Sequence, residues 1–427
     1  MQTKLFLKNI FWVQLINFIA KPIWIIAIDR FVQNQIGLEN YGQYHLIFSL
    51  ATVFFIITDL GLNNFMTKYL VANNLRSNAL LNLSGGLKLI LSILYLTVLI
   101  SIGLSRNLDI ILIIWVGANQ VLLSLNQWLR VWFNVNKFFV KEALLSVIDR
   151  VVAILLWAGI FFLFQMPQGL LLYVFLGVQT MGFAIAIIIT LWQIPFFNSD
   201  SEELVFKNSF KTILKSCLPF TFLAFFMAAY ARLDVVLLNL LLKEGNFQIG
   251  IYAQGFRILD ALNIFAALIG TMLLPIFTHI ISQKNNPMMI IKSSLMVIIS
   301  SIVLLLLGLH FFGEYFYLKL YSTASGLDLN YGFQVFKFVV IIYVPMSLIY
   351  IFGTYLTALG KMNYLIALAI FCFLLNLGLN LYVIPQFKAL GAAKIANVTQ
   401  WVFLLGCIYK TILQLKKGVH NENEIDL

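Results

Sequence analysis

Charged residues are scarce in this 427-residue sequence, at 11% of the chain, whereas hydrophobic residues make up 61% and the mean hydropathy is +0.94. Soluble globular proteins contain about 25% charged residues, so the composition excludes a soluble protein. The alternation of apolar and polar residues that a membrane β-barrel strand requires is also missing, which leaves helices as the spanning structure. The sequence therefore predicts an all-α polytopic membrane protein.

Cysteine and histidine are rare as well. The three cysteines, Cys217, Cys372 and Cys407, lie far apart, and the four histidines are scattered. No spacing fits a disulfide framework, a zinc site or a haem site, and there is no glycine–lysine phosphate loop. We therefore expect no metal, no cofactor and no ATP-driven pump within this chain. The net charge of +11 does not indicate a nucleic-acid partner, because the basic residues follow the pattern of membrane loops.

Long apolar runs recur along the whole chain, and about 20 such residues cross the hydrocarbon core. They predict twelve spans, near 10–32, 42–72, 82–104, 109–130, 142–164, 169–195, 214–242, 248–280, 288–312, 332–359, 362–385 and 390–414. A polar stretch between the sixth and seventh spans reads as a linker. We expect an N-terminal six-helix lobe over 1–197, a cytoplasmic linker over 198–213, a C-terminal six-helix lobe over 214–415 and a cytoplasmic tail over 416–427.

Basic residues between these spans gather on one side of the membrane. Only Arg106, Lys243, Lys319 and Lys388 fall on the other side. The positive-inside rule then places both termini in the cytoplasm. The basic start and long apolar stretch of the first span lack a cleavage site, so we expect a retained first helix.

The two halves of the sequence match each other around their first helix junctions. Four residues recur at one constant offset: Gly37 with Gly245, Gly42 with Gly250, Tyr44 with Tyr252, and Phe48 with Phe256. The matched junctions fall on the same side of the membrane. The sequence therefore predicts two parallel repeats, related by an axis along the membrane normal.

Three stretches resemble helices of one transporter family. They are residues 37–71, GLENYGQYHLIFSLATVFFIITDLGLNNFMTKYLV, residues 250–280, GIYAQGFRILDALNIFAALIGTMLLPIFTHI, and residues 357–400, which begin TALGKMNYLIALAIF. They resemble the second, the eighth, and the eleventh and twelfth helices of the Wzx-type O-antigen and polysaccharide flippases. This polysaccharide transporter family belongs to the multidrug/oligosaccharidyl-lipid/polysaccharide exporter superfamily. The resemblance covers nearly the whole chain, in the right order.

The resemblance implies a fold and a function. The fold is MATE-like, with two pseudo-symmetric six-helix lobes around a central cavity. The function is transport, not catalysis: a flippase in polysaccharide biosynthesis that moves an undecaprenyl-diphosphate-linked oligosaccharide, such as an O-antigen unit of lipopolysaccharide, by alternating access. The substrate passes from the cytoplasmic to the outer leaflet of the cell inner membrane. An H⁺ or Na⁺ gradient would drive transport, and membrane lipids and a polysaccharide polymerase are further expected partners.

Charged side chains inside a span cost roughly 2.5–3.5 kcal/mol each on insertion scales, so they have a partner or a function. The candidates for binding a diphosphate are Lys21, Arg30, Arg150, Arg232 and Arg257. Lys21 precedes Pro22, which removes a backbone hydrogen bond and predicts a bent helix. The alternative is that Lys21 pairs with an acid on a neighbouring helix, such as Asp59.

Other charged residues are interpreted from their spacing. Asp149 and Arg150 are adjacent, so they should point in different directions and each needs another partner. Arg257 and Asp260 are three apart and can pair on one helix face, and binding of substrate phosphate would break that pair. Lys88 lies near a span end, so we expect its amine to reach the interface.

Acidic and amide residues supply the remaining candidates. Asp29, Asp59 and Asp234 are candidates for coupling transport to an ion. Asn63, Asn119 and Asn126 are candidates for lining a glycan cavity, and hydrogen bonds between helices are the alternative for each. Asn376 and Asn380, four apart, share one helix face.

Two other functions compete with a flippase. A cation-coupled drug or metabolite antiporter would have the same fold, but binding organic cations favours an acidic cavity and this sequence is basic. A membrane glycosyltransferase or polymerase would be an enzyme with key residues in a large outer loop. The longest outer loop here carries only Glu314, Lys319 and Asp328 as charged residues.

Overall fold

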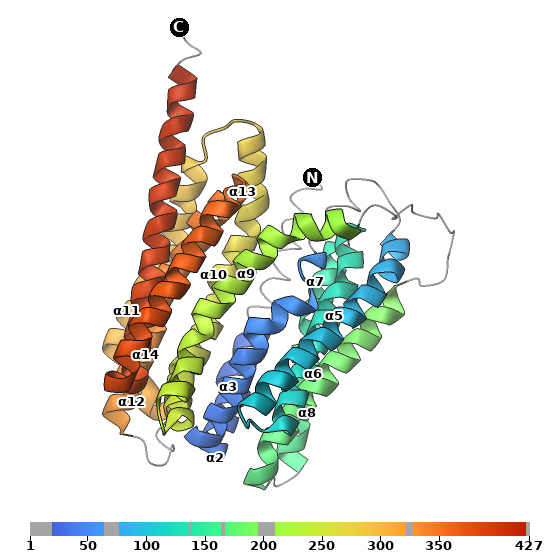
Figure 1. The fold of residues 1–427 in the computed structure, drawn as a ribbon, viewed down its shortest axis with the longest axis vertical. Coiled ribbons are helices and arrows are strands. Elements are labelled where there is room, and N and C mark those ends of the chain that lie inside the picture. The colour runs from blue at the N-terminus through green and yellow to red at the C-terminus, as the bar shows by residue number, and fades with distance from the viewer. Residues whose placement is uncertain are drawn as a thin grey trace. The chain divides into compact units, whose positions relative to one another are not determined.

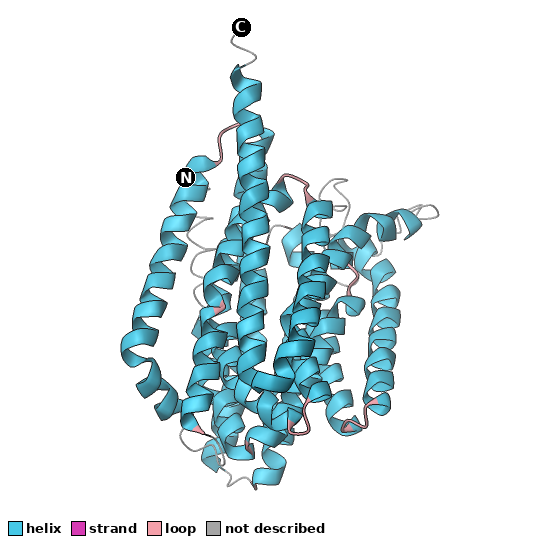
Figure 2. Ribbon diagram, turned by 60° about the vertical axis from the view of Figure 1, so that its left-hand side comes forward, coloured by secondary structure: helices cyan, strands magenta, loops and turns pink. Residues whose placement is uncertain are grey.

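The structure is a computed structural model that describes residues 19–63, 77–136, 138–163, 167–194, 210–321 and 328–423. Within these ranges every regular element is a helix (Figure 2). Ten candidate spans in the described chain are long and apolar enough to cross a membrane. The chain is thus an all-helical, multi-pass membrane protein, as the composition predicts.

The helices group into two compact units. Unit 1 lies within residues 1–36 and 44–225, and unit 2 lies within residues 37–43 and 226–427. Residues 37–43, at the start of the second span, therefore pack with the second half of the chain. Most of the predicted linker over 198–213 lies outside the described residues, so the lobe boundaries stay a prediction.

Unit 1 holds the helices drawn from blue to green in Figure 1. They are the π-helix η1 (Trp24–Asp29), α2 (Arg30–Ile36), most of α3 (Leu38–Phe54), the 3₁₀ helix η2 (Phe55–Thr58), α5 (Ser77–Ser105), α6 (Ile110–Val135), α7 (Phe139–Leu163) and α8 (Gln168–Gln193). Helix α8 packs against both α6 and α7, while α5 packs against α6 and η2. Helices α5 and α7 thus bury one face each, against α6 and α8 respectively.

The first span is irregular where its sequence is unusual. Two residues after Pro22 the helix widens into the π-helix η1, and Asp29 is buried at its end. A π-turn bends a helix and occurs often at functional sites. The irregularity lies over 24–29.

The second span breaks earlier than its hydropathy predicts. Helix α3 ends at Phe54 and η2 ends at Thr58, after which Leu60 and Gly61 take φ angles of 43° and 80°. The expectation of one continuous helix over 42–72 is therefore wrong at this point. Asp59 stands in the break, and its main-chain carbonyl accepts a hydrogen bond from the amide of Leu62.

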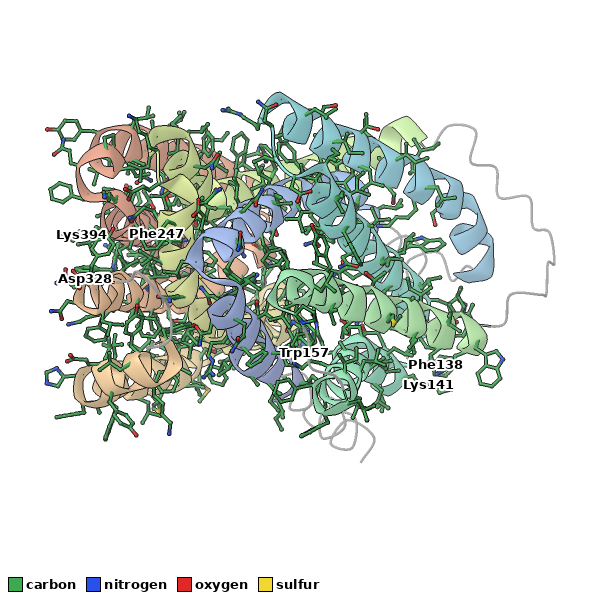
Figure 3. All side chains as sticks on the ribbon, turned by 90° about the horizontal axis from the view of Figure 1, so that it is seen from below. Phe138, Lys141, Trp157, Phe247, Asp328 and Lys394 are labelled. Atoms are coloured by element: carbon green, nitrogen blue, oxygen red, sulfur yellow. The ribbon has the colours of Figure 1, made fainter. Side chains whose placement is uncertain are left out.

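Aromatic side chains fill much of unit 1. The ring of Trp24 stacks on Phe175 with centroids 5.3 Å apart, and Trp157 packs edge-on against both Phe31 and Phe175. Figure 3 labels Trp157 on α7. These contacts attach η1 and α2 to α7 and α8.

Unit 2 holds the helices drawn from yellow-green to red in Figure 1. They are the later part of α9 (Phe210–Leu241), α10 (Gly245–Ser282), α11 (Met288–Tyr321), α12 (Leu329–Ile341), α13 (Tyr343–Ala358) and α14 (Met362–Asn423). Helix α10 packs against α12, α13 and α14, and α13 also packs against α14. Helix α10 is therefore central to this unit.

Helix α14 is a hairpin of two helices. The backbone of Lys388 is non-helical, with φ 51° and ψ −136°, and the chain reverses there. Asn376 on the first arm contacts Thr399 on the second at 3.4 Å, and Tyr364 donates to the carbonyl of Gly406. The candidate span over 362–416 thus includes both predicted spans, 362–385 and 390–414. The total of twelve stays a prediction, because part of the first span is not described.

The matched glycines of the two halves lie at helix junctions. Gly37 separates α2 from α3 with a φ of 83°, a value that favours glycine. Gly245 begins α10, shortly after α9 ends at Leu241. The duplication itself stays a prediction.

Candidate functional site

Lys21 lies within electrostatic range of four charged side chains in unit 1. Lys21 interacts electrostatically with Asp149, Arg150, Arg130 and Glu142. These five residues, called the Lys21 cluster below, come from the first span, the end of α6 and the N-terminal half of α7. Three are basic and two are acidic, so the cluster carries excess positive charge. Among the described residues, the amine of Lys21 has no direct ion pair or hydrogen bond.

The acidic members of the cluster each bind an arginine. The Nε of Arg130 lies 3.7 Å from Oε1 of Glu142, and the Nε of Arg150 lies 3.3 Å from Oδ2 of Asp149. The expectation that adjacent Asp149 and Arg150 would not pair is wrong, because their side chains fold toward each other. Both carboxylates are thus engaged beside Lys21.

Arg150 also lies between two aromatic rings. Its guanidinium is 5.7 Å from the ring centroid of Trp24 and 5.4 Å from that of Phe183. Cation–π contacts of this kind favour arginine, whose planar group stacks on rings. They hold the Arg150 side chain against η1, on the same helix as Lys21. At the start of α7, Lys141 similarly approaches the Phe138 ring at 5.5 Å (Figure 3).

Asp59 pairs with Lys88, not with Lys21. The Nζ of Lys88 on α5 lies 3.2 Å from Oδ1 of Asp59, and the Lys88 side chain is 0% exposed. The expectation that Lys88 reaches the interface is therefore wrong, and so is the alternative that Lys21 binds Asp59. The pair stabilises the break after η2, where Thr58 also bonds Ser124 on α6.

The remaining candidates of unit 1 differ in their surroundings. Asn119 is used within the unit: its amide donates to the carbonyl of Leu176 and its oxygen accepts from Thr180, so helix packing explains it. Asn126 is buried, and its side-chain oxygen has no hydrogen-bond partner among the described residues.

The other three lie at helix ends. The main-chain amide of Asn63 donates to the carboxylate of Asp59 at 3.4 Å. Arg30 begins α2, and its Nε is buried without a hydrogen bond in the described chain. Asp29 is buried at the end of η1.

Two arginines share one carboxylate in unit 2. The Nη2 of Arg232 on α9 lies 3.5 Å from Asp260, and the Nη1 of Arg257 lies 3.8 Å from it. The pairing of Arg257 with Asp260 confirms the prediction from their spacing. Arg232 also stacks over the Phe256 ring at 4.3 Å, and the Nε of Arg257 donates to the Tyr41 hydroxyl at 2.9 Å. We call Arg232 and Arg257, with Asp260 as their shared counterion, the arginine pair.

Asp234 lies in a network of neutral donors. Tyr252 donates to one carboxylate oxygen at 3.0 Å, and Asn380 donates to the other at 2.7 Å. The same Asn380 amide reaches Asn376, which in turn donates to Thr399. Asp234 is 1% exposed. Within the described chain no basic side chain forms an ion pair with it.

A small cavity adjoins Asp234. Its volume is about 20 Å³, and Tyr230, Tyr252, Thr399 and Gln400 line it together with Asp234. A cavity of this size holds about one water molecule. Carboxylate, amide and hydroxyl oxygens are the ligands that hard cations prefer, so the site suits a proton, a water molecule or a small cation.

The structure groups the predicted residues into separate sites and adds some that the sequence reading missed. Lys21 and Arg150 come together in one unit, and Arg232 and Arg257 come together in the other. Arg130 and Glu142 were missed as members of the Lys21 cluster, although they flank one short connection and so had to lie near each other. Tyr41 gave no sequence signal.

Long apolar helices that bury charged clusters are typical of membrane transporters, in which intramembrane charges mark substrate and ion pathways. Several solved structures share this fold. The chain is similar to an inward-facing multidrug resistance MATE family transporter of the MOP superfamily, with 14% identity, a TM-score of 0.67, and coverage of 95% of this chain and 96% of that chain. MOP denotes the exporter superfamily named above.

Two further solved structures share the fold. A MOP superfamily transporter from Pyrococcus furiosus has 13% identity and a TM-score of 0.63, covering 98% of this chain and 96% of that one. The lipid II flippase MurJ, in an inward closed conformation, has 16% identity and a TM-score of 0.58, covering 98% and 90%. At these identities the likeness establishes the fold, which is MATE- and MurJ-like.

The chain belongs to the polysaccharide biosynthesis protein family, whose profile matches residues 6–281. This membership confirms the resemblance to Wzx-type transporters seen in the sequence. The MOP superfamily transporters named above share its fold. A comparison with curated proteins found no significant match.

Proposed function

We propose that the protein flips an undecaprenyl-diphosphate-linked oligosaccharide from the cytoplasmic to the outer leaflet of the bacterial inner membrane. The observation that carries the proposal is the Lys21 cluster. It keeps an ammonium group without a direct partner in the described chain, beside two arginines, inside a membrane protein. A half-buried cation of this kind is costly in a membrane protein unless an anion binds there.

The chemistry of the cluster fits a diphosphate. Arginine offers a planar fork to phosphate oxygens, and lysine offers a mobile point charge. Glu142 and Asp149 neutralise only part of the basic charge, so an anion is attracted while the empty site stays tolerable. Family membership in polysaccharide biosynthesis supports a lipid-linked glycan as the source of that anion.

The arginine pair supplies a second anion site, in unit 2. Asp260, with 27% of its side chain exposed, acts as the counterion of both Arg232 and Arg257. A substrate diphosphate carries more charge than one carboxylate and would replace it. Transfer of the headgroup between the Lys21 cluster and the arginine pair would accompany alternating access.

Asp234 is the best candidate for coupling to an ion gradient. A buried carboxylate held only by neutral donors is unstable as an anion, and binding H⁺ or Na⁺ in the adjoining cavity removes that cost. Asp59 is less suited, because Lys88 already neutralises it. Asp29 also stays a candidate for ion coupling, because it is buried at the end of the π-helix η1.

Several further features belong to the same proposal. Both termini would lie in the cytoplasm, and two six-helix lobes, joined by the linker over 198–213, would enclose a central cavity. Asn63 and Asn126 would face the glycan there. The exported units would pass to a polysaccharide polymerase, for O-antigen or another surface polymer.

The proposal is tested by deleting the gene in its host and determining which leaflet holds the polyprenyl-linked glycan. The strain is complemented at matched protein levels with wild type, Lys21→Gln or Lys337→Gln. Lys337 is an exposed lysine on α12 and serves as the matched control. We expect glycan to remain on the cytoplasmic leaflet in the deletion strain and with Lys21→Gln, and to be cleared by wild type and Lys337→Gln.

Normal export in the deletion strain, without a second transporter, would contradict the flippase. The alternative is a cation-coupled drug or metabolite antiporter, which the fold likeness to a multidrug transporter favours. That alternative predicts drug resistance lost on deletion, with glycan export intact.

A further inference from the structure

We propose that Tyr41 is a positioning residue for the arginine pair: its hydroxyl orients the Arg257 guanidinium that receives the substrate diphosphate. The inference rests on the proposed function, because it assigns a role within the same anion site. Tyr41 and Arg257 are 216 residues apart in the sequence.

The geometry fixes the guanidinium at two edges. The Nε of Arg257 donates to the Tyr41 hydroxyl at 2.9 Å, while Nη1 lies 3.8 Å from Asp260. Nε and Nη1 belong to one rigid planar fork, so two contacts define its plane. When a diphosphate replaces Asp260, the contact with Tyr41 still holds that plane. The arginine then loses less side-chain freedom on binding.

Two glycines bring Tyr41 to this position. A Cβ atom on Gly42 would collide with the backbone carbonyl of Asn246, and a Cβ on Gly250 would collide with the carbonyl of Leu38. Small residues allow such close approach between membrane helices. The start of α3 is therefore packed on α10, and Arg257 lies two helical turns beyond Gly250 on the same face.

The hydroxyl, and not the ring, is the feature that needs explanation. Tyr41 is 0% exposed, and phenylalanine would fill the same space in an apolar core. Another buried tyrosine of unit 2, Tyr355, packs its ring edge-on against Phe277 with centroids 5.3 Å apart. Tyr355→Phe is thus a matched control that removes a buried hydroxyl away from the arginine pair.

The test measures binding of undecaprenyl diphosphate to the purified full-length protein in lipid nanodiscs, by native mass spectrometry. Undecaprenyl monophosphate is the comparison ligand. We expect Tyr41→Phe to weaken diphosphate binding about five- to tenfold, the size expected for one hydrogen bond to a charged group. Tyr355→Phe should bind within twofold of wild type, and both variants should unfold at the wild-type temperature.

A double-mutant cycle separates positioning from a general structural effect. Lysine has no Nε–H in a planar fork, so Arg257→Lys removes the group that Tyr41 contacts. We expect Arg257→Lys to weaken diphosphate binding at least as much as Tyr41→Phe, and Tyr41→Phe to add less than a twofold loss in that background.

The outcomes distinguish failure of the proposed function from failure of the role assigned to Tyr41. Wild-type protein that does not bind undecaprenyl diphosphate overturns the proposed function and this inference with it. Wild-type binding that Tyr41→Phe leaves unchanged, or that Arg257→Lys leaves unchanged, overturns the inference alone. An equal loss from Tyr41→Phe in the wild-type and the Arg257→Lys backgrounds assigns Tyr41 a structural role and also overturns it.

Discussion

The Nζ of Lys88 lies 3.2 Å from Oδ1 of Asp59, at the point where the second span stops being helical. Lys88 is fully buried, and Asp59 is mostly so. Lys88 lies on α5 and Asp59 lies in the break after η2, so the ion pair is a contact between separate segments. Asp59 is therefore not available to Lys21, and its ion pair with Lys88 stabilises the break after η2.

Breaking this pair on one side should be costly. Lys88→Met leaves Asp59 without its counterion, and we expect a loss of about 3–5 kcal/mol in the free energy of unfolding. The double variant Lys88→Met with Asp59→Asn should recover most of that loss, because no charge is left unpaired. Thermal unfolding of the purified protein measures both, with Lys337→Met as the control. A double variant as unstable as the single one would contradict the account.

Removing an acid from the Lys21 cluster should strengthen anion binding. Glu142→Gln leaves Lys21, Arg130 and Arg150 with one carboxylate, so we expect undecaprenyl diphosphate to bind about two- to fivefold more tightly at low salt. The gain should shrink as ionic strength rises. Glu314→Gln, an exposed acid on α11, is the control and should not change binding. Weaker binding by Glu142→Gln would show that this acid orients the cations.

Neutralising Asp234 should uncouple transport without unfolding the protein. Asp234→Asn keeps the shape of the side chain and removes a buried charge, so the unfolding temperature should be unchanged or higher. In proteoliposomes, an imposed H⁺ or Na⁺ gradient should accelerate lipid-linked glycan flipping by wild type and not by Asp234→Asn. Gradient-driven flipping by the variant at the wild-type rate would exclude Asp234 as the coupling residue.

Two glycine substitutions should have opposite effects. Gly250→Ala places a methyl group against the Leu38 carbonyl, and overpacking of this kind costs about 1–3 kcal/mol of stability. It should also weaken undecaprenyl diphosphate binding, because it displaces Tyr41. At Gly378 on α14, a Cβ atom would meet nothing within 4 Å, so Gly378→Ala should be neutral or stabilising by about 0.5–1 kcal/mol. Thermal unfolding compares the two, and equal stabilities would argue against the close α3–α10 contact.

Local spacing predicted some of the contacts that form along one helix. Arg257 and Asp260, three apart, pair as expected, and Asn376 and Asn380, four apart, share a hydrogen bond beside Asp234. Where the expected behaviour depended on neighbours across helices, spacing failed. Lys88 binds Asp59 and does not reach the interface. Asp149 and Arg150, although adjacent on α7, also form an ion pair that the spacing did not predict.

By itself, the sequence determined that this is a helical membrane protein of the polysaccharide biosynthesis protein family. Apolar runs and helical periodicity are local properties, so they can be read without coordinates. Only the tertiary structure decided that Lys88 binds Asp59, that Asp260 serves both Arg232 and Arg257, and that Tyr41 contacts Arg257. Apart from Arg257 and Asp260, which share α10, those partners come from separate segments, and their distances depend on packing that no single segment specifies.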